Sequence, residues 1–291
     1  MSELTWGTVL GGTGRPRFII CGTELVENGS FEANTYGWVG SPSTDKISRE
    51  EDSATYWGDY SCQISDDGAQ VSRSKARYAL EASSALANKS FAVSMYVKSD
   101  VASTCSVQLS SLDETLAIQE KAITTTYGHF FGVFSFSTSI KTAFNLDVFA
   151  AAGGSYSNII NIDKASCREV SNNLYAEFPY SPNTDEPEYA EDLLSSGRLV
   201  DGSLKEYRRG WAPRFLFRYD YLDQTTEYYR RLLSEADFIW LQPHYDYEYY
   251  VAVKWDGKWS QQYFGGVHAG HVGEMAFKSI YLLESKPLDI V

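Results

Sequence analysis

The sequence of 291 residues is poor in cysteine, and the arrangement of its cysteines excludes several kinds of site. The four cysteines are Cys21, Cys62, Cys105 and Cys167, and none of them forms the C-x-x-C spacing of a zinc site or a redox pair. We therefore expect four buried free thiols. The alternative is a disulfide bridge between Cys21 and Cys167, which a reducing compartment disfavours.

Long apolar runs and an excess of positive charge are also missing. No stretch approaches the roughly 20 apolar residues of a membrane-spanning helix, and the N-terminus lacks the basic-then-apolar order of a secretory signal. The formal net charge of −13 disfavours nucleic acid and anionic membranes as partners. We expect a protein that is made in cytoplasm, does not insert into membranes and binds neutral ligands or other proteins.

The common catalytic motifs are absent as well. The sequence contains no G-x-S-x-G elbow, no H-E-x-x-H helix and no Walker loop. The carboxylate pairs Asp66-Asp67 and Asp113-Glu114 lie in turn-like contexts, whereas a glycosidase needs two carboxylates that flank a cleft. Nothing in the sequence therefore argues for an enzyme.

Aromatic residues are abundant, at 15% of the chain with 21 tyrosines, and this favours β-structure. Apolar residues alternate with others along several stretches, which is typical of strands that bury one face. The alternating apolar positions are Phe91, Val93, Met95 and Val97, then Phe130, Phe134 and Phe136, then Phe144, Leu146 and Val148. Residues 76–88 are expected to form a loop or a short helix. The sequence predicts a mainly β fold.

Two stretches of the N-terminal half carry a resemblance to a known family. Residues 25–38 read LVENGSFEANTYGW, and residues 159–170 read IINIDKASCREV. These resemble the opening and the last strand of carbohydrate-binding modules of the family 4/9/22 type. The resemblance implies a jelly-roll β-sandwich over residues 23–172.

The resemblance also implies candidate ligand positions. Modules of this type often hold a structural calcium ion near the two chain ends of the sandwich, and the matching residues are Glu32 and Asp163. The alternative is that both are ordinary carboxylates of a turn and a surface. Aromatic rings that could stack on sugar are Tyr56, Trp57 and Tyr96, whereas Trp38 is expected in the core.

The rest of the chain divides into a linker and a second domain. Residues 173–200 are acidic and contain prolines, so we expect an extended linker. Residues 201–291 are expected to form a smaller β-rich domain with one short helix, in which Tyr229, Leu232, Leu233 and Ala236 share a stripe. The order of elements resembles small structural domains of tailed-bacteriophage virions, in the tail or baseplate region. Residues 1–22 are an N-terminal arm that could belong to the same domain.

The second domain combines basic and aromatic residues in a way that favours a protein interface. Arg208, Arg209, Arg214 and Arg218 are close in sequence, and ten of the 21 tyrosines lie between Tyr207 and Tyr263. Arginine and tyrosine are enriched at interfaces. The interface residues that we select are Trp211, Arg214, Arg218 and Tyr219. The alternative is a solvated strand edge protected against aggregation.

These observations predict a non-catalytic structural protein of a bacteriophage particle. Its C-terminal domain would dock onto other virion proteins and copies of itself, and its jelly roll would be displayed to a host surface glycan. The alternative function is a glycan-binding module of a carbohydrate-degrading system. A purely structural jelly roll without a ligand is a third possibility.

Overall fold

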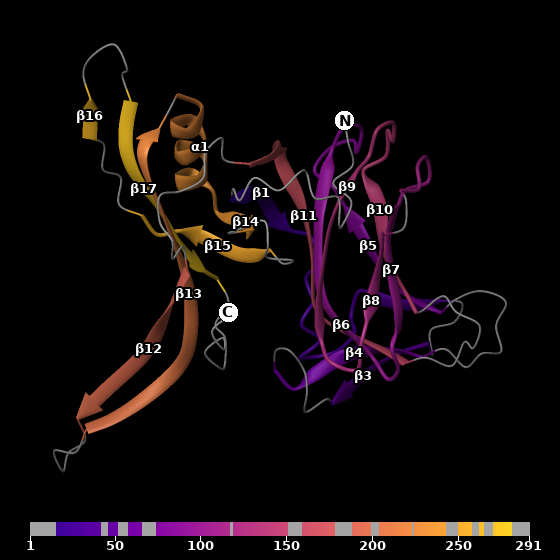
Figure 1. Cartoon of the computed structure of the whole chain (residues 1–291). Coiled ribbons are helices and arrows are strands. Elements are labelled where there is room, and N and C mark those ends of the chain that lie inside the picture. The colour runs from indigo at the N-terminus through magenta and orange to yellow at the C-terminus, as the bar shows by residue number, and fades with distance from the viewer. Residues whose placement is uncertain are drawn as a thin grey trace. The chain divides into compact units, whose positions relative to one another are not determined.

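In the residues that it describes, a computed structural model shows a mainly β protein with one helix, as the sequence predicts (Figure 1). The residues that it describes are 16–41, 46–51, 58–65, 74–116, 119–150, 159–177, 188–198, 204–222, 224–242, 250–257, 262–264 and 270–280. No helix among these residues has both the length and the apolar character needed to span a membrane. Contacts divide the chain into two units. Unit 1 contains Gly22–Asn173, and unit 2 joins the strand residues before Gly22 to the chain from Leu174 onwards.

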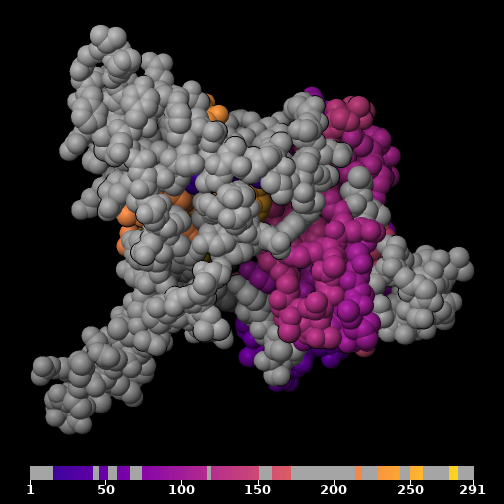
Figure 2. Space-filling view, in the orientation of Figure 1, coloured from indigo at the N-terminus to yellow at the C-terminus, as the bar shows by residue number. Residues whose placement is uncertain are grey.

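Unit 1 is a sandwich of two antiparallel sheets. The first sheet has the order β9 (Gly128–Ser135), β6 (Ser90–Ser99), β11 (Ile159–Glu177), β4 (Tyr60–Ser65) and β3 (Ile47–Glu51). The second sheet has the order β2 (Trp38–Ser41), β5 (Lys75–Glu81), β10 (Ala143–Phe149), β7 (Ser103–Ser110) and β8 (Gln119–Ile123). The magenta surface in Figure 2 belongs to this unit.

The core of unit 1 is formed by the inner faces of the two sheets. The alternating residues of the predicted strands, among them Phe91, Met95 and Leu146, are all buried in one apolar cluster. Trp38 also lies in this cluster, as predicted, and its ring packs on Phe31. All four cysteines are free and buried, which confirms that prediction. Burial raises the pKa of the Cys62 and Cys105 thiols to about 12, so both are unreactive as thiolates at neutral pH.

One local prediction in unit 1 was wrong. Residues 76–88 were expected to form a loop or a short helix, but their first part belongs to strand β5, and a loop follows. Ala76, Tyr78 and Leu80 point into the core and alternate with more exposed residues. Tertiary burial with a period of two therefore overrides the helical preference of alanine, leucine and glutamate.

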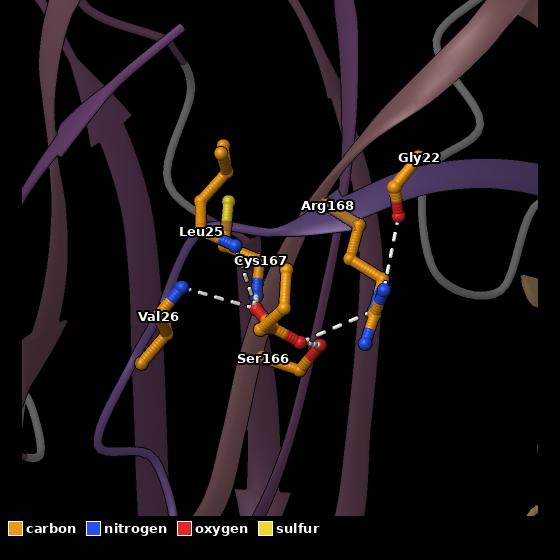
Figure 3. Close-up of polar contacts among 7 residues, drawn as sticks. Gly22, Leu25, Val26, Ser166, Cys167 and Arg168 are labelled. Atoms are coloured by element: carbon orange, nitrogen blue, oxygen red, sulfur yellow. Dashed lines mark hydrogen bonds and ion pairs between the residues drawn. The ribbon is translucent and has the colours of Figure 1, made fainter.

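The carboxylate of Glu24 joins the first residues of unit 1 to its last strand. Glu24 lies at the end of β1 (Arg17–Glu24) and accepts hydrogen bonds from the Ser166 hydroxyl at 2.6 Å and the Cys167 N–H at 2.8 Å. Arg168 forms an ion pair with the same carboxylate at 3.1 Å and donates to the Gly22 carbonyl (Figure 3). The opening stretch is thus fixed to the last strand of the sandwich. We call this group the Glu24 clip.

Unit 2 is one antiparallel sheet with one helix. Its strands have the order β12 (Glu188–Arg198), β13 (Leu204–Leu222), β17 (Gly270–Ser279), β15 (Val251–Trp255), β14 (Phe238–Gln242) and β1, and β16 (Gln262–Phe264) pairs with β17. Helix α1 (Gln224–Glu235) buries Leu233 against the sheet, with Tyr229, Leu232 and Ala236 beside it. The predicted helical stripe is therefore confirmed.

The structure differs from the linker predicted over residues 173–200. Glu188–Arg198 forms strand β12, which pairs with β13 from Glu188 opposite Phe215 to Arg198 opposite Leu204. The acidic strand lies beside a strand that carries Lys205, Arg208, Arg209 and Arg214. Backbone pairing with β13 therefore takes the place of the extended linker that the local sequence predicts. Residues 178–187, which hold the prolines, lie outside the described residues.

Candidate functional site

The outer face of the second sheet in unit 1 carries aligned polar side chains. On β5 and β10 the inward positions are apolar, so Lys75, Arg77, Asn145, Asp147 and Phe149 take the opposite positions. On β7, Ser106 and Gln108 alternate in the same way with buried residues. We call these seven residues the polar face.

The register of the strands aligns the residues of the polar face in rows that run across β5, β10 and β7. Asp147 of β10 lies opposite Arg77 of β5 on one side and opposite Gln108 of β7 on the other. The next row brings Phe149 between Lys75 and Ser106. Because directly opposed residues in antiparallel strands have neighbouring side chains, each row forms a short continuous surface.

Asp147 fixes this surface. Its carboxylate is only 2% exposed and accepts from Arg77 at 2.7 and 2.9 Å and from Lys75 at 3.0 Å. The hydrogen bond to Asp147 raises the pKa of Arg77, against a smaller opposing effect of burial. The Lys75 ammonium also lies 4.9 Å from the centre of the Phe149 ring. These contacts hold both cations and the ring in one orientation.

The polar face has the chemistry of a binding surface. Amide and hydroxyl groups such as those of Gln108, Asn145 and Ser106 can exchange hydrogen bonds with a polyhydroxylated ligand. Both oxygens of Asp147 already accept from cations, so this carboxylate anchors its neighbours and is not available as a general base. Sequence reasoning missed this face because it searched for exposed aromatic rings. The signal that could have found it is the polar alternation Lys75-x-Arg77 and Asn145-x-Asp147 between apolar positions.

Of the aromatic residues predicted to bind glycan, the structure describes Tyr96 alone, and it does not lie on the polar face. Tyr96 is on β6 of the other sheet, half-buried, with its ring 4.9 Å from the His129 ring. Burial lowers the pKa of His129 to about 3, and the nearby Lys121 adds to this shift. Tyr56 and Trp57 lie outside the described residues.

The predicted calcium ligands each accept hydrogen bonds from backbone N–H groups of the protein. The Glu32 carboxylate accepts from the N–H groups of Asp59 and Tyr60 at 3.3 and 3.4 Å. Asp163 is fully buried and accepts from the N–H of Lys164 at 2.6 Å. The described chain has no group of three or more acidic, histidine or cysteine residues that could hold a metal ion. A calcium ion takes six to eight oxygen ligands, so two carboxylates would have to be joined by backbone oxygens to hold it.

The predicted interface residues lie on β13. The Arg214 side chain forms an ion pair with Asp256 of its own chain, so this charge is already partly satisfied. Arg218 and Tyr219 take register positions opposite Glu274 and Gly273 of β17, and Trp211 lies opposite Asp192 of β12. The side chains of Trp211, Arg218 and Tyr219 lie outside the described residues.

Comparison with known proteins agrees with the resemblance in the N-terminal half. Residues 23–157 match the family model described as a carbohydrate binding domain. This match contains the opening stretch at residues 25–38. A search of curated proteins found no match.

Several solved structures resemble about half of this chain at low identity. A putative sugar binding protein from Bacteroides thetaiotaomicron VPI-5482 is 10% identical, with 50% of this chain and 100% of that chain covered and a TM-score of 0.39. The CBM22-1 xylan-binding domain of Paenibacillus barcinonensis Xyn10C is 16% identical, with coverage of 52% and 97% and a TM-score of 0.38. The enzymatically active domain of bacteriophage CBA120 tailspike protein 4 is 14% identical, with coverage of 50% and 21% and a TM-score of 0.38. These likenesses are too distant to argue for a ligand or a partner. What the comparisons show is a carbohydrate-binding-module resemblance over residues 23–157.

Proposed function

We propose that unit 1 is a non-catalytic carbohydrate-binding module that holds its ligand on the polar face. The observation that carries the proposal is the family match over residues 23–157. It favours the glycan-binding alternative over the virion protein as the first function to test. In this function the module binds a glycan and does not cleave it.

The choice of the second sheet follows from exposure. On the outer side of the first sheet, Ala92, Phe131 and Val133 are 1%, 3% and 7% exposed and do not belong to the core between the sheets. That side is therefore covered around these three residues of β6 and β9. By contrast, Gln108 and Asn145 on the second sheet remain half-exposed, and a sugar can reach their amides.

The test measures glycan binding by the full chain, first on a glycan array and then by calorimetry. Gln108→Ala and Asn145→Ala should each weaken binding by about tenfold, since one lost hydrogen bond contributes about 1 kcal/mol or more. The matched control is Gln63→Ala, which removes the same amide from β4 of the first sheet. Unchanged affinity in both variants, or no glycan bound at all, would overturn the proposal.

A second candidate function is assembly with other chains, favoured by the β12–β13 ribbon. Residues 204–213 of β13 precede its pairing with β17, so within the described chain they pair with β12 alone (Figure 1). A two-stranded ribbon is marginally stable in water, and its edge is a template for another strand. We propose that a second copy of this chain pairs with β12. Incorporation into a virion with other virion proteins, after synthesis in a host cytoplasm, is the wider context of this proposal.

The sequence of β12 is complementary to itself in the antiparallel direction. Pairing two copies about Leu193 sets Glu188 opposite Arg198 of the second copy, with no like charges opposed. Glu188→Arg should therefore weaken the dimer by about tenfold, and adding Arg198→Glu should restore it. Glu191→Arg is the control, because Glu191 would face the uncharged Ser195. Analytical ultracentrifugation of the full chain measures this. A monomer at all concentrations, or a failed restoration, would contradict the proposal.

A further inference from the structure

The end of unit 1 where calcium was expected contains two positively charged side chains. Arg49 of β3 donates from its Nε to the Phe31 carbonyl at 2.9 Å and from its Nη2 to the Glu32 carbonyl. Its guanidinium also lies 3.2 Å from the centre of the Tyr60 ring. The backbone oxygens that would have completed a calcium shell next to Glu32 therefore already receive hydrogen bonds from a cation.

The second cation is Lys164, which follows Asp163 in a bulge of β11. Its backbone is in the left-handed region, with φ of 51°, and the ladder between β11 and β6 shifts register between Asp163 and Ser166. Its backbone N–H donates to the Asp163 carboxylate at 2.6 Å. The lysine therefore lies directly beside one of the two carboxylates that the resemblance assigned to the metal.

The loop opposite is shaped to approach Glu32 closely. Gly58 has φ of +77°, and a side chain on it would meet the Glu32 carboxylate at 2.2 Å. This glycine lets the N–H groups of Asp59 and Tyr60 reach the same carboxylate. The carboxylate and carbonyl oxygens at this end are thus supplied with donors from the protein itself.

We propose that Arg49 and Lys164 replace a metal ion at this end of the sandwich, so that unit 1 folds without calcium. A divalent ion placed here would meet two like charges and would have to displace the hydrogen bonds of Arg49. Since charge repulsion and lost hydrogen bonds both oppose the ion, the internal cations take over its structural role.

The test compares thermal unfolding of the full chain in millimolar calcium chloride and in EDTA. The unmodified chain should unfold at the same temperature in both, and calorimetric titration should detect no calcium binding. Lys164→Ala should unfold several degrees lower in EDTA. Calcium should then raise its transition by about 3 °C or more, because a ligand that binds only the folded state stabilises it by mass action. The control is Lys141→Ala, which removes an exposed loop lysine. This variant should unfold at the same temperature as the unmodified chain, both in EDTA and in calcium chloride.

Arg49→Lys separates charge from hydrogen bonding. It keeps the positive charge but loses the paired donors to the Phe31 and Glu32 carbonyls, so it should unfold at a lower temperature without gaining a response to calcium. Calcium stabilisation of the unmodified chain would overturn the proposal. So would a Lys164→Ala variant as stable as the Lys141→Ala control. If Lys164→Ala does not fold, the titration of the unmodified chain still decides the question.

Discussion

Three carboxylates of unit 1 and the ion pair of helix α1 in unit 2 are held in different ways. In unit 1, the carboxylates of Glu24, Glu114 and Asp147 each accept hydrogen bonds from a segment distant in sequence. Glu114, for example, accepts from the N–H groups of Thr138 at 2.9 Å and Ser139 at 3.2 Å. In unit 2, Arg231 and Glu235 form an ion pair within one helical turn, with side chains 72% and 65% exposed.

This difference indicates where charge contributes to stability. A carboxylate with several donors and little exposure fixes the position of two segments, and its removal leaves those donors unsatisfied. An exposed pair is screened by solvent and contributes about 0–1 kcal/mol. We therefore expect substitutions of these carboxylates in unit 1 to cost more stability than substitutions of the exposed pair in helix α1, whereas apolar substitutions should affect both units.

Apolar core substitutions should have the largest effect and should separate the two units. Phe91 of unit 1 contacts Phe136 and Phe144, and Phe277 of unit 2 contacts Phe217 and Trp255. Replacing either Phe91 or Phe277 by alanine should cost about 3–5 kcal/mol. Calorimetry should show two transitions, with each variant lowering only its own. A common shift of both transitions would show that the units unfold together.

The Glu24 clip should be the most sensitive polar contact of unit 1. Glu24→Ala leaves the N–H of Cys167 and the Arg168 guanidinium without their carboxylate, which should cost about 2–3 kcal/mol. Glu24→Gln keeps an acceptor and should cost less. Urea unfolding of the full chain measures both values. Equal costs for the two substitutions would mean that charge, and not hydrogen bonding, stabilises the clip.

The sequence predicts the apolar half of this molecule well, for a physical reason. Burial with a period of two is a local pattern, so the inner positions around Phe91, Phe130 and Phe144 could be identified directly. The helical stripe at Tyr229 and Leu233 could be identified in the same way. Both patterns follow from the geometry of a strand and a helix, without knowledge of any partner element.

The polar contacts of this molecule depend on which strands pair and in which register, and neither can be read from the local sequence. Asp147 meets Arg77 across 70 residues, and only the β5–β10 ladder brings them together. The β12 strand was missed for a similar reason, because only its pairing with β13 distinguishes it from an extended linker. Arg49 reaches the carbonyl of Phe31 across 18 residues. The resemblance to a family supplied Glu32 and Asp163 as metal ligands, but it did not include the cations placed beside them.

Acid should destabilise unit 1 before unit 2. The folded pKa of His129, about 3, lies below its ordinary value of 6.5, so the unfolded chain binds a proton first. The stabilising effect is fully present above pH 6.5 and is lost as the pH falls towards 3. For Glu114, partial burial is outweighed by hydrogen bonds from the 137–139 loop, which lower its pKa to about 2, and this effect is lost between pH 4.5 and 2.

Thermal unfolding between pH 7 and pH 4 measures the His129 effect. The transition of unit 1 should fall by about 5 °C or more over this range. His129→Gln keeps a polar side chain next to Ser94, whose hydroxyl lies 2.8 Å from the His129 ring, but does not titrate. Its transition should depend much less on pH. A slope as steep as that of the unmodified chain would assign the acid sensitivity to other groups.

The smallest effect is expected for the exposed ion pair of helix α1. Glu235→Ala removes a contact of 3.3 Å between Arg231 and Glu235, both of which are largely in water. A surface pair at this spacing contributes about 0.3–0.5 kcal/mol, and salt screens it. The free energy of unfolding of unit 2 should therefore change by no more than about 0.5 kcal/mol, and raising the salt concentration should abolish the difference. Glu24→Ala measured under the same conditions supplies the contrast, because its hydrogen bonds persist in salt. A Glu235→Ala cost as large as that of Glu24→Ala would show that exposure does not separate the two units.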